Sequence, residues 1–294
     1  MISSAHPIAS KIGLDILKNG GNAFDAAIAV HFALSVVYPN AGNIGGGGFL
    51  VYRLNNGDIG TLDFREKAPE KSYRDMYIDS IEGELKVDDK RSKFGHLASG
   101  VPGSVDGMVK IYDKFSTVDW KALLEPSIKV AREGFGVTEK QAKGLNNVKK
   151  SLVSANDHPI PFIKEDPWKV GDILTQKNLA NTLEEIKKSK RNGIYKGAVA
   201  ELIINEMKSG GGIITQSDLD NYSSVWREPV IGYFKNHKII SMGPPSSGGI
   251  ALVQLLHGAE QLETTNYDHN SLEYINTITE IESRVYADRA THLG

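Results

Sequence analysis

The stretch that decides the fold spans residues 39–65 and begins with Pro39-Asn40-Ala41-Gly42-Asn43-Ile44-Gly45-Gly46-Gly47-Gly48-Phe49. Residues 42–48, which we call the glycine loop, include five glycines. Ordering glycine costs more backbone entropy than ordering any other residue. Such a loop is therefore useful only where backbone must come close to other atoms or adopt a positive φ.

Two apolar runs follow the glycine loop, residues 49–54 and 59–64, and they flank Asn55-Asn56-Gly57-Asp58. Short apolar runs separated by an Asn-Gly turn are typical of a β-hairpin. The second strand of this hairpin is expected to end at Arg65, which directly follows the run. We therefore expect Arg65 at a rigid strand end close to the glycine loop.

A glycine-rich loop first suggests a phosphate cradle, but the surrounding residues argue against one. Gly48 is followed by Phe49 rather than by a Lys-Ser or Lys-Thr pair, so the loop is not a P-loop. A dinucleotide fingerprint lies between a strand and a helix, whereas this loop follows a helical pattern and enters a strand. On spacing alone, a tight turn in which backbone packs against backbone is the favoured interpretation.

Composition excludes several classes of protein. The 294 residues include 34 basic and 36 acidic ones, and the net charge of −2 predicts neither a nucleic-acid partner nor a membrane-surface partner. The longest apolar run, residues 26–37, is short and interrupted by His31 and Ser35, so no membrane span is expected. No signal peptide is expected in this sequence, because no charged and then apolar leader precedes Ser3. The absence of cysteine excludes disulfides and thiol catalysis.

Apolar periodicity predicts a helix over residues 8–17, closed by Asn19-Gly20-Gly21, and a second, capped by Asn22, through Val36. The second is apolar almost all round, so we expect it buried against a sheet, with His31 hydrogen-bonded in the core. Further expected elements are a surface excursion over residues 73–96, a helix capped by Ser104, a hairpin over 229–242, and helices over 250–262 and 272–289. Without repeats or a clear linker, residues 1–294 are expected to form a single domain.

Residues 39–49 resemble the glycine-rich motif of the gamma-glutamyltranspeptidase family, bacterial branch, and the resemblance continues through most of the chain. Residues 63–69 resemble its arginine motif, with Lys67 where a threonine is common. Several motifs in the right order identify the chain as a member far more specifically than one alone. The remaining matches are residues 3–10, 20–27, 100–104, 243–249 and 287–294.

The resemblance implies an α+β fold, the αββα sandwich of the N-terminal nucleophile hydrolases, of which this chain supplies only part. It also implies a precursor that cuts itself into two subunits, the smaller beginning with a catalytic threonine. That threonine attacks a γ-glutamyl amide, glutathione being the expected donor, while its own α-amino group acts as the base. This chain would be the large-subunit portion, incomplete at both ends, of a protein exported to the periplasm or the cell exterior. Neither a cofactor nor a metal is implied.

No catalytic residue is expected within this chain. The family's junction reads Thr-Thr-His, then an aromatic residue and serine. Thr264-Thr265-Asn266 has asparagine in place of histidine, and Thr291-His292 lies in a motif well upstream of the junction. We therefore expect the sequence to stop short of the cleavage site, with the oxyanion-hole groups also in the small subunit.

Arg65 is the one expected substrate-binding residue, because it resembles the arginine that grips the α-carboxylate of the glutamyl group. A planar guanidinium holds a carboxylate through two parallel hydrogen bonds, which fix orientation as well as charge. The alternative is a structural ion pair with Asp63, Glu66 or Glu70. Near residues 243–249, Ser246 or Ser247 either contributes to a carboxylate site or simply caps the following helix.

Three other functions stay open at this point. The substrate is alternatively poly-γ-glutamate or an acylated β-lactam side chain, as in relatives similar in fold. The glycine loop alternatively serves a nucleotide-binding module. The chain is otherwise a non-catalytic scaffold, since a half without a nucleophile only folds or associates.

Overall fold

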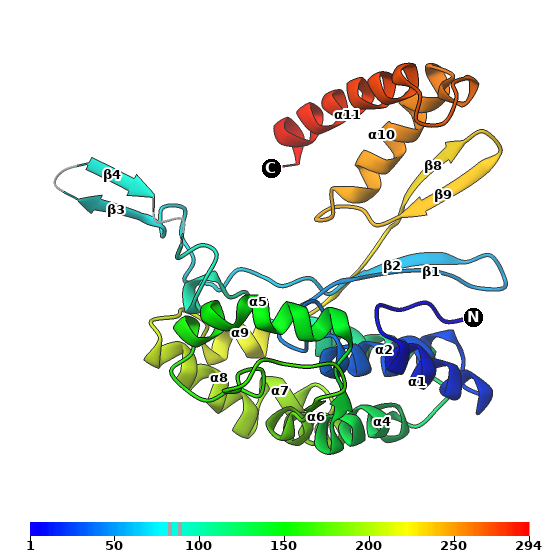
Figure 1. Ribbon diagram of the computed structural model, residues 1–294. Helices are drawn as coiled ribbons and strands as arrows, with labels where there is room; N and C mark the ends of the chain where they lie inside the picture. The colour runs from blue at the N-terminus through cyan, green and yellow to red at the C-terminus, as the bar shows by residue number, and fades with distance from the viewer. Residues whose placement is uncertain (82–83, 88–89, 294) are drawn as a thin grey trace. The chain divides into compact units, whose positions relative to one another are not determined.

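The structure is a computed structural model that describes residues 1–81, 84–87 and 90–293. It divides the chain into two compact units (Figure 1). The first unit combines Met1–Gly48 with Phe64–Ser224, and the second combines Phe49–Asp63 with Val225–Gly294. Whether both fold together as the single domain expected from the sequence stays a prediction.

The first unit is mainly helical. Its helices are α1 Pro7–Lys18, α2 Ala23–Val37, α3 Ser104–Phe115, α4 Trp120–Glu133, α5 Glu139–Ala155, α6 Lys177–Ser189, α7 Asn192–Tyr195, α8 Gly197–Ser209 and α9 Gln216–Asn221, with a 3-10 turn at His96–Ala98. Two short antiparallel ribbons accompany them: β3 Ile78–Ile81 with β4 Glu84–Val87, and β5 Phe135–Gly136 with β6 Ile173–Leu174.

Helix α2 begins where the sequence predicts, because Asn22 and Asp25 form a capping box. The Asn22 side chain accepts from the N–H of Phe24 and Asp25, while the Asp25 carboxylate accepts from the N–H of Asn22. Burial acts to raise the pKa of Asp25. Hydrogen bonds from Ser116, Asn22 and Thr117 outweigh that effect and hold the pKa below its usual range.

Helix α2 packs against other helices of its own unit, and the expectation that a sheet also covers it stays a prediction. Within the first unit the helix packs chiefly against α1, α4 and α3. Its apolar residues Ile28, Phe32 and Val36 are fully buried there. A helix that is apolar all round requires apolar neighbours on every side, and other helices satisfy that requirement as well as a sheet does.

Two further details of the first unit were not predicted. Gly103, rather than Ser104, is the N-cap of α3, and Ser104 is its first residue. The predicted surface excursion over residues 73–96 contains the β3–β4 ribbon; its residues 82–83 and 88–89 lie outside the described residues. Charged residues and weak periodicity concealed this ribbon from the sequence analysis.

The second unit holds the remaining strands. Its elements are β1 Phe49–Arg53, β2 Ile59–Asp63, β7 Val225–Arg227, β8 Val230–Phe234, β9 His237–Ser241, α10 Gly248–Gln261, a 3-10 turn at Thr264–Asn266, and α11 Leu272–His292. Strands β1, β2 and β7 form an antiparallel sheet in that order, with Phe49 opposite Asp63 and Leu62 opposite Trp226. The β8–β9 hairpin contacts α10, which in turn contacts α11.

Both hairpins predicted from the sequence are therefore confirmed. Gly57 turns the first one with a φ of 94°, a conformation that glycine adopts without steric cost. A membrane-spanning helix is absent from the described residues, since no helix there is both long and apolar enough.

Candidate functional site

Arg65 lies immediately beside the glycine loop, as predicted. Phe64 and Gly48 exchange backbone hydrogen bonds of 3.0 and 3.3 Å just past the end of β2. A Cβ on Gly47 would come within 2.4 Å of the Phe64 carbonyl oxygen and 2.8 Å of the Arg65 carbonyl carbon. The φ of Gly47 is not positive. Close approach of backbone to backbone, the interpretation favoured on spacing, explains this part of the loop.

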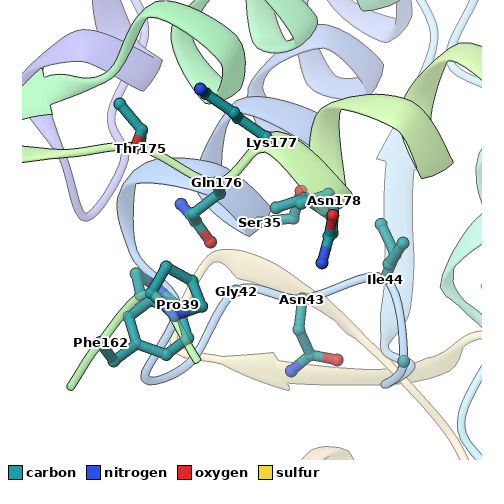
Figure 2. Close-up of a pocket in the computed structure, with 13 residues that line it drawn as sticks. Ser35, Pro39, Gly42, Asn43, Ile44, Phe162, Thr175, Gln176, Lys177 and Asn178 are labelled. Atoms are coloured by element: carbon teal, nitrogen blue, oxygen red, sulfur yellow. The ribbon is translucent and has the colours of Figure 1, made fainter. Parts of the chain in front are cut away.

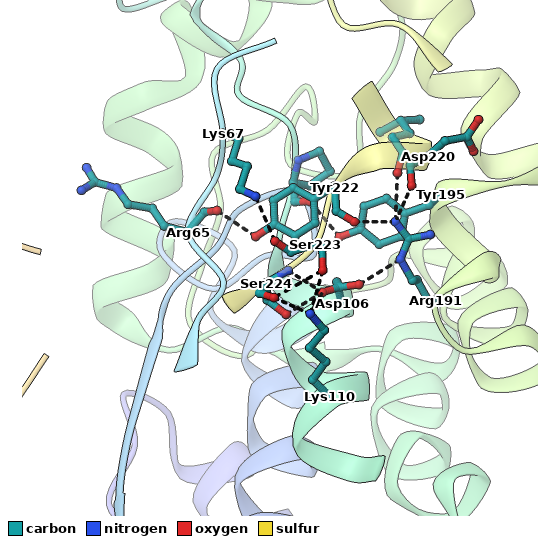
Figure 3. A network of polar contacts seen from close by, with 12 residues as sticks. Arg65, Lys67, Asp106, Lys110, Arg191, Tyr195, Asp220, Tyr222, Ser223 and Ser224 are labelled. Atoms are coloured by element: carbon teal, nitrogen blue, oxygen red, sulfur yellow. Dashed lines mark hydrogen bonds and ion pairs between the residues drawn. The ribbon is translucent and has the colours of Figure 1, made fainter. Parts of the chain in front are cut away.

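The backbone and the side chain of Arg65 point in different directions. The Arg65 carbonyl oxygen accepts a 2.8 Å hydrogen bond from the Tyr222 hydroxyl, whereas the guanidinium projects away from the polar network around Tyr222 (Figure 3). The side chain is exposed. Asp63, one of the ion-pair partners considered for Arg65, accepts a 2.9 Å hydrogen bond from Nε of Arg227.

A buried carboxylate organises that network. Asp106 on α3 accepts from the Nε of Arg191 at 2.9 Å through one oxygen, and from the N–H and hydroxyl of Ser224 at 2.8 and 2.5 Å through the other. Lys110 donates to the Ser224 carbonyl. A buried carboxylate with this many donors is fully satisfied, so it fixes the position of the segment that contains Ser224.

Lys67, the residue that departs from the family's common threonine, belongs to the same network. Its Nζ donates to the Ser223 carbonyl at 2.9 Å and lies 5.1 Å from the centre of the Tyr222 ring. Its backbone pairs with that of Val101 in both directions, at 3.2 and 2.8 Å. Lys67 therefore places a cation against the Tyr222 ring.

A cavity of about 660 Å³ opens at the start of the glycine loop (Figure 2). Gly42, Asn43 and Ile44 line one part of it, and Gln176 and Lys177 at the start of α6 line another. Gln176 is buried, and its side-chain amide donates to the Val36 carbonyl at 2.7 Å. The cavity wall thus includes the glycine loop but none of the predicted substrate-binding groups.

The two threonine segments set aside in the sequence are engaged in helical structure. Thr264 opens a 3-10 turn, is 4% exposed, and donates its hydroxyl to the Ala259 carbonyl at 3.1 Å. Thr291 lies within α11 and donates to the Ala287 carbonyl at 3.0 Å. A hydroxyl held by a helix carbonyl, in mid-chain and so without its own α-amino group, lacks the activation that an N-terminal threonine has.

The serines at the start of α10 make different contacts. The Ser246 hydroxyl accepts from the N–H of Gly248 at 3.3 Å. The Ser247 hydroxyl accepts from Nε of Arg289 at 2.9 Å and makes no capping bond. The motifs at residues 243–249 and 287–294 therefore meet at this contact within the second unit.

His31 does not make the hydrogen bond expected of it. Its Nε2 is buried and lacks a hydrogen-bond partner within the described part of the chain. The ring meets Phe32 and Phe64 edge to face, at centroid distances of 5.9 and 6.2 Å. These aromatic neighbours offer no acceptor, and burial lowers the pKa of His31 to about 4.

Comparisons with known proteins agree with these observations. The sequence profile of the family described as gamma-glutamyltranspeptidase matches residues 9–294. The chain is 42% identical to the glutathione hydrolase proenzyme of Escherichia coli (strain K12), over 100% of this chain and 50% of that protein. The crystal structure of Helicobacter pylori gamma-glutamyltranspeptidase aligns at 44% identity with a TM-score of 0.95, over 99% of this chain and 83% of that one. The Pseudomonas nitroreducens gamma-glutamyltranspeptidase complexed with L-DON aligns at 39% identity with a TM-score of 0.93, over 100% of this chain and 86% of that one.

Fold and comparisons together define an α+β protein of the N-terminal nucleophile hydrolase type, of which this chain supplies part. The chain belongs to the gamma-glutamyltranspeptidase family, as its motifs predicted. It spans about half the length of the curated relatives it matches.

Sequence reasoning identified Arg65 but overlooked Tyr222, which contacts it from 157 positions away. The available signal was the glycine at position 103. A Cβ there would lie 2.0 Å from the Phe64 carbonyl oxygen and 2.1 Å from the Tyr222 hydroxyl. The motif at residues 100–104 thus contains a glycine because a backbone carbonyl and a tyrosine side chain converge on it.

Proposed function

We propose that this chain is the large-subunit part of an enzyme that cleaves the γ-glutamyl amide of glutathione and related compounds. The glutamyl group would pass to water, an amino acid or a peptide. Family membership supports the reaction class, and the matched relatives from Escherichia coli, Pseudomonas and Bacillus subtilis are named glutathione hydrolase proenzymes. The partner is the small subunit of the same precursor, which would carry the threonine nucleophile.

Arg65 is the residue of this chain that we assign to substrate binding. The observation that carries the assignment is the exposed guanidinium on a fixed backbone, in the family's arginine motif. Two parallel hydrogen bonds to the α-carboxylate would fix the glutamyl group in one orientation. The γ-carbonyl would then face the threonine of the small subunit, whose α-amino group takes the hydroxyl proton.

The test is Arg65→Lys in the full-length enzyme, which keeps the positive charge and loses the two parallel N–H donors of the guanidinium. A charge-assisted hydrogen bond contributes about 1.5–3 kcal/mol, so kcat/KM for a γ-glutamyl anilide should fall roughly 10- to 150-fold. Most of the change should appear in KM, because the carboxylate is held alike in substrate and transition state.

Arg53→Lys is the matched control, since Arg53 is another exposed arginine at a strand end. Its kinetics should equal those of the parent enzyme. Unchanged kinetics in Arg65→Lys would remove Arg65 from the site and favour its ion-pair role.

Processing and export complete the proposal. Mass spectrometry of the native product should find two fragments, the smaller beginning with threonine. Cell fractionation should place the activity in the periplasm or the medium. A single uncut product would favour the scaffold alternative over the enzyme, and a panel of glutathione, poly-γ-glutamate and acylated β-lactam substrates would separate the enzymatic alternatives.

A further inference from the structure

The Tyr222 hydroxyl makes a long-range contact with the backbone of Arg65. Tyr222 follows α9 directly and is 3% exposed. Its hydroxyl donates to the Arg65 carbonyl oxygen at 2.8 Å. A buried hydroxyl that donates to a backbone carbonyl restrains that carbonyl, since breaking the bond would leave a buried polar atom without its partner.

The ring of Tyr222 contacts two neighbouring side chains in the network of Figure 3. It stacks on Tyr195 with a centroid distance of 5.9 Å and an interplanar angle of 12°. Nζ of Lys67 lies 5.1 Å from the Tyr222 centroid. The Tyr222 carbonyl accepts from Nη2 of Arg191 at 2.7 Å, and Arg191 in turn pairs with the buried Asp106. The hydroxyl is therefore presented from a rigid support.

The backbone around Arg65 is thereby fixed at three points, at residues 64, 65 and 67. Phe64 pairs with Gly48, the Arg65 carbonyl accepts from Tyr222, and Lys67 pairs with Val101. The guanidinium lies at the end of a long side chain. A small rotation of the peptide at residue 65 would therefore displace the guanidinium by a larger distance from the carboxylate that it would hold. A displacement of about 1 Å in a positioning group is enough to reduce rates strongly.

We propose that Tyr222 is a positioning residue for Arg65, acting through the Arg65 carbonyl and not by touching the substrate. The proposal rests on the proposed function, in which Arg65 binds the α-carboxylate. It assigns to the first unit a support for substrate binding that extends from Arg65 through Tyr222 to Asp106 and Arg191.

The test uses Tyr222→Phe in the full-length enzyme, which keeps the ring and deletes the hydroxyl. KM for a γ-glutamyl anilide should rise roughly 2- to 10-fold, the range of one neutral hydrogen bond, while kcat stays within about twofold. Tyr77→Phe is the control, because the Tyr77 hydroxyl also donates to a backbone carbonyl, that of Leu97 at 2.9 Å, outside this network. A general loss of stability would affect both variants, whereas the KM shift should be confined to Tyr222→Phe.

The double variant Tyr222→Phe with Arg65→Lys tests whether Tyr222 acts through Arg65, separately from whether Arg65 binds the substrate. If Tyr222 acts through Arg65, the double variant should have the KM of Arg65→Lys alone, within about twofold. Fully multiplied effects, or a Tyr222→Phe enzyme that behaves like Tyr77→Phe, would overturn the positioning role while leaving Arg65 in place. An unchanged KM in Arg65→Lys itself would instead remove Arg65 from substrate binding, and with it this inference, while the proposed γ-glutamyl chemistry would still be tested by its own experiments.

Discussion

The two compact units differ in how they bury their apolar side chains. The first has a dense core, with Ile28, Phe32, Leu123 and Leu183 among its fully buried residues. In the second, the buried apolar residues within the described range are Leu62, Met242, Ile281 and Val285. The second unit therefore exposes more large apolar side chains than it buries, among them Trp226, Ile231, Tyr233, Leu252, Leu272, Ile275 and Tyr286.

This difference indicates which unit needs a partner. A unit with its own core satisfies the main driving force of folding internally. A unit that leaves aromatic and aliphatic side chains exposed gains most from a surface that covers them, and large exposed patches favour association. Under the proposed function, the covering surface is the small subunit of the precursor.

The largest expected effect is on catalysis by the 294-residue chain alone. It should not turn over a γ-glutamyl anilide at any pH, because its sequence lacks the junction motif that supplies nucleophile and base. It should also self-associate, since its strands present open edges. Co-expression with a fragment that begins at the catalytic threonine should restore activity and solubility, as measured by turnover and light scattering.

Measurable hydrolysis by the purified chain, free of a second fragment, would contradict this account. The nucleophile would then have to be sought at Thr264, Thr265 or Thr291. A monodisperse monomer would contradict the comparison of the two units, because the second unit would then be stable with its apolar residues in water.

The next effect is a difference between two leucine truncations. Leu123 in α4 is 0% exposed and Leu252 in α10 is 40% exposed. Leu123→Ala should lower the free energy of unfolding by about 2–5 kcal/mol. Leu252→Ala in the isolated chain should cost less than about 1 kcal/mol, because that side chain is already partly in water.

Denaturant unfolding at low protein concentration, followed by tryptophan fluorescence, measures both changes. In the full-length enzyme, the cost of Leu252→Ala should increase if the small subunit covers α10. Equal losses for both variants in the isolated chain would show that the second unit has a core of its own.

The sequence was most informative where local chemistry determines the backbone. The Asn-Gly turn, the Asn22 N-cap and the glycine loop were all recognisable because each requires particular residues at fixed positions. Arg65 was placed correctly beside the glycine loop because an antiparallel hairpin brings the end of its second strand back to the start of its first, with Asp63 opposite Phe49.

What the sequence could not predict depends on contacts between distant residues. Tyr222 meets Arg65 across 157 positions, and no local pattern marks a tyrosine that donates to a remote carbonyl. The helices that pack on α2 were not predicted for the same reason: an all-round apolar helix indicates burial but not what covers it. The missing hydrogen bond of His31 likewise follows from its aromatic neighbours, one of which is 33 positions away in sequence.

The smallest expected effect concerns a weak point inside the well-packed first unit. Burial lowers the pKa of His31 to about 4, well below its value of 6.5 in an unfolded chain. Between these two values the unfolded state binds more protons than the folded state, so stability falls as the pH decreases from 6.5 toward 4. Between pH 7 and pH 5 the loss should be on the order of 2 kcal/mol.

His31→Leu in the full-length enzyme should remove most of this loss, because leucine places no ionisable group against Phe32 and Phe64. Melting temperatures at pH 7 and pH 5 measure this loss of stability. The parent should melt at a clearly lower temperature at pH 5 than at pH 7, and His31→Leu should narrow this gap in melting temperature. Part of the gap should remain, since burial also lowers the pKa of His6 in the same unit. His257→Gln, at an exposed position in the second unit, is the control and should keep the parent's gap. If His31→Leu shows the same difference in melting temperature between pH 7 and pH 5 as the parent, the His31 imidazole reaches a hydrogen-bond acceptor or water in solution. The core of the first unit would then be more open around α2 than its packing indicates.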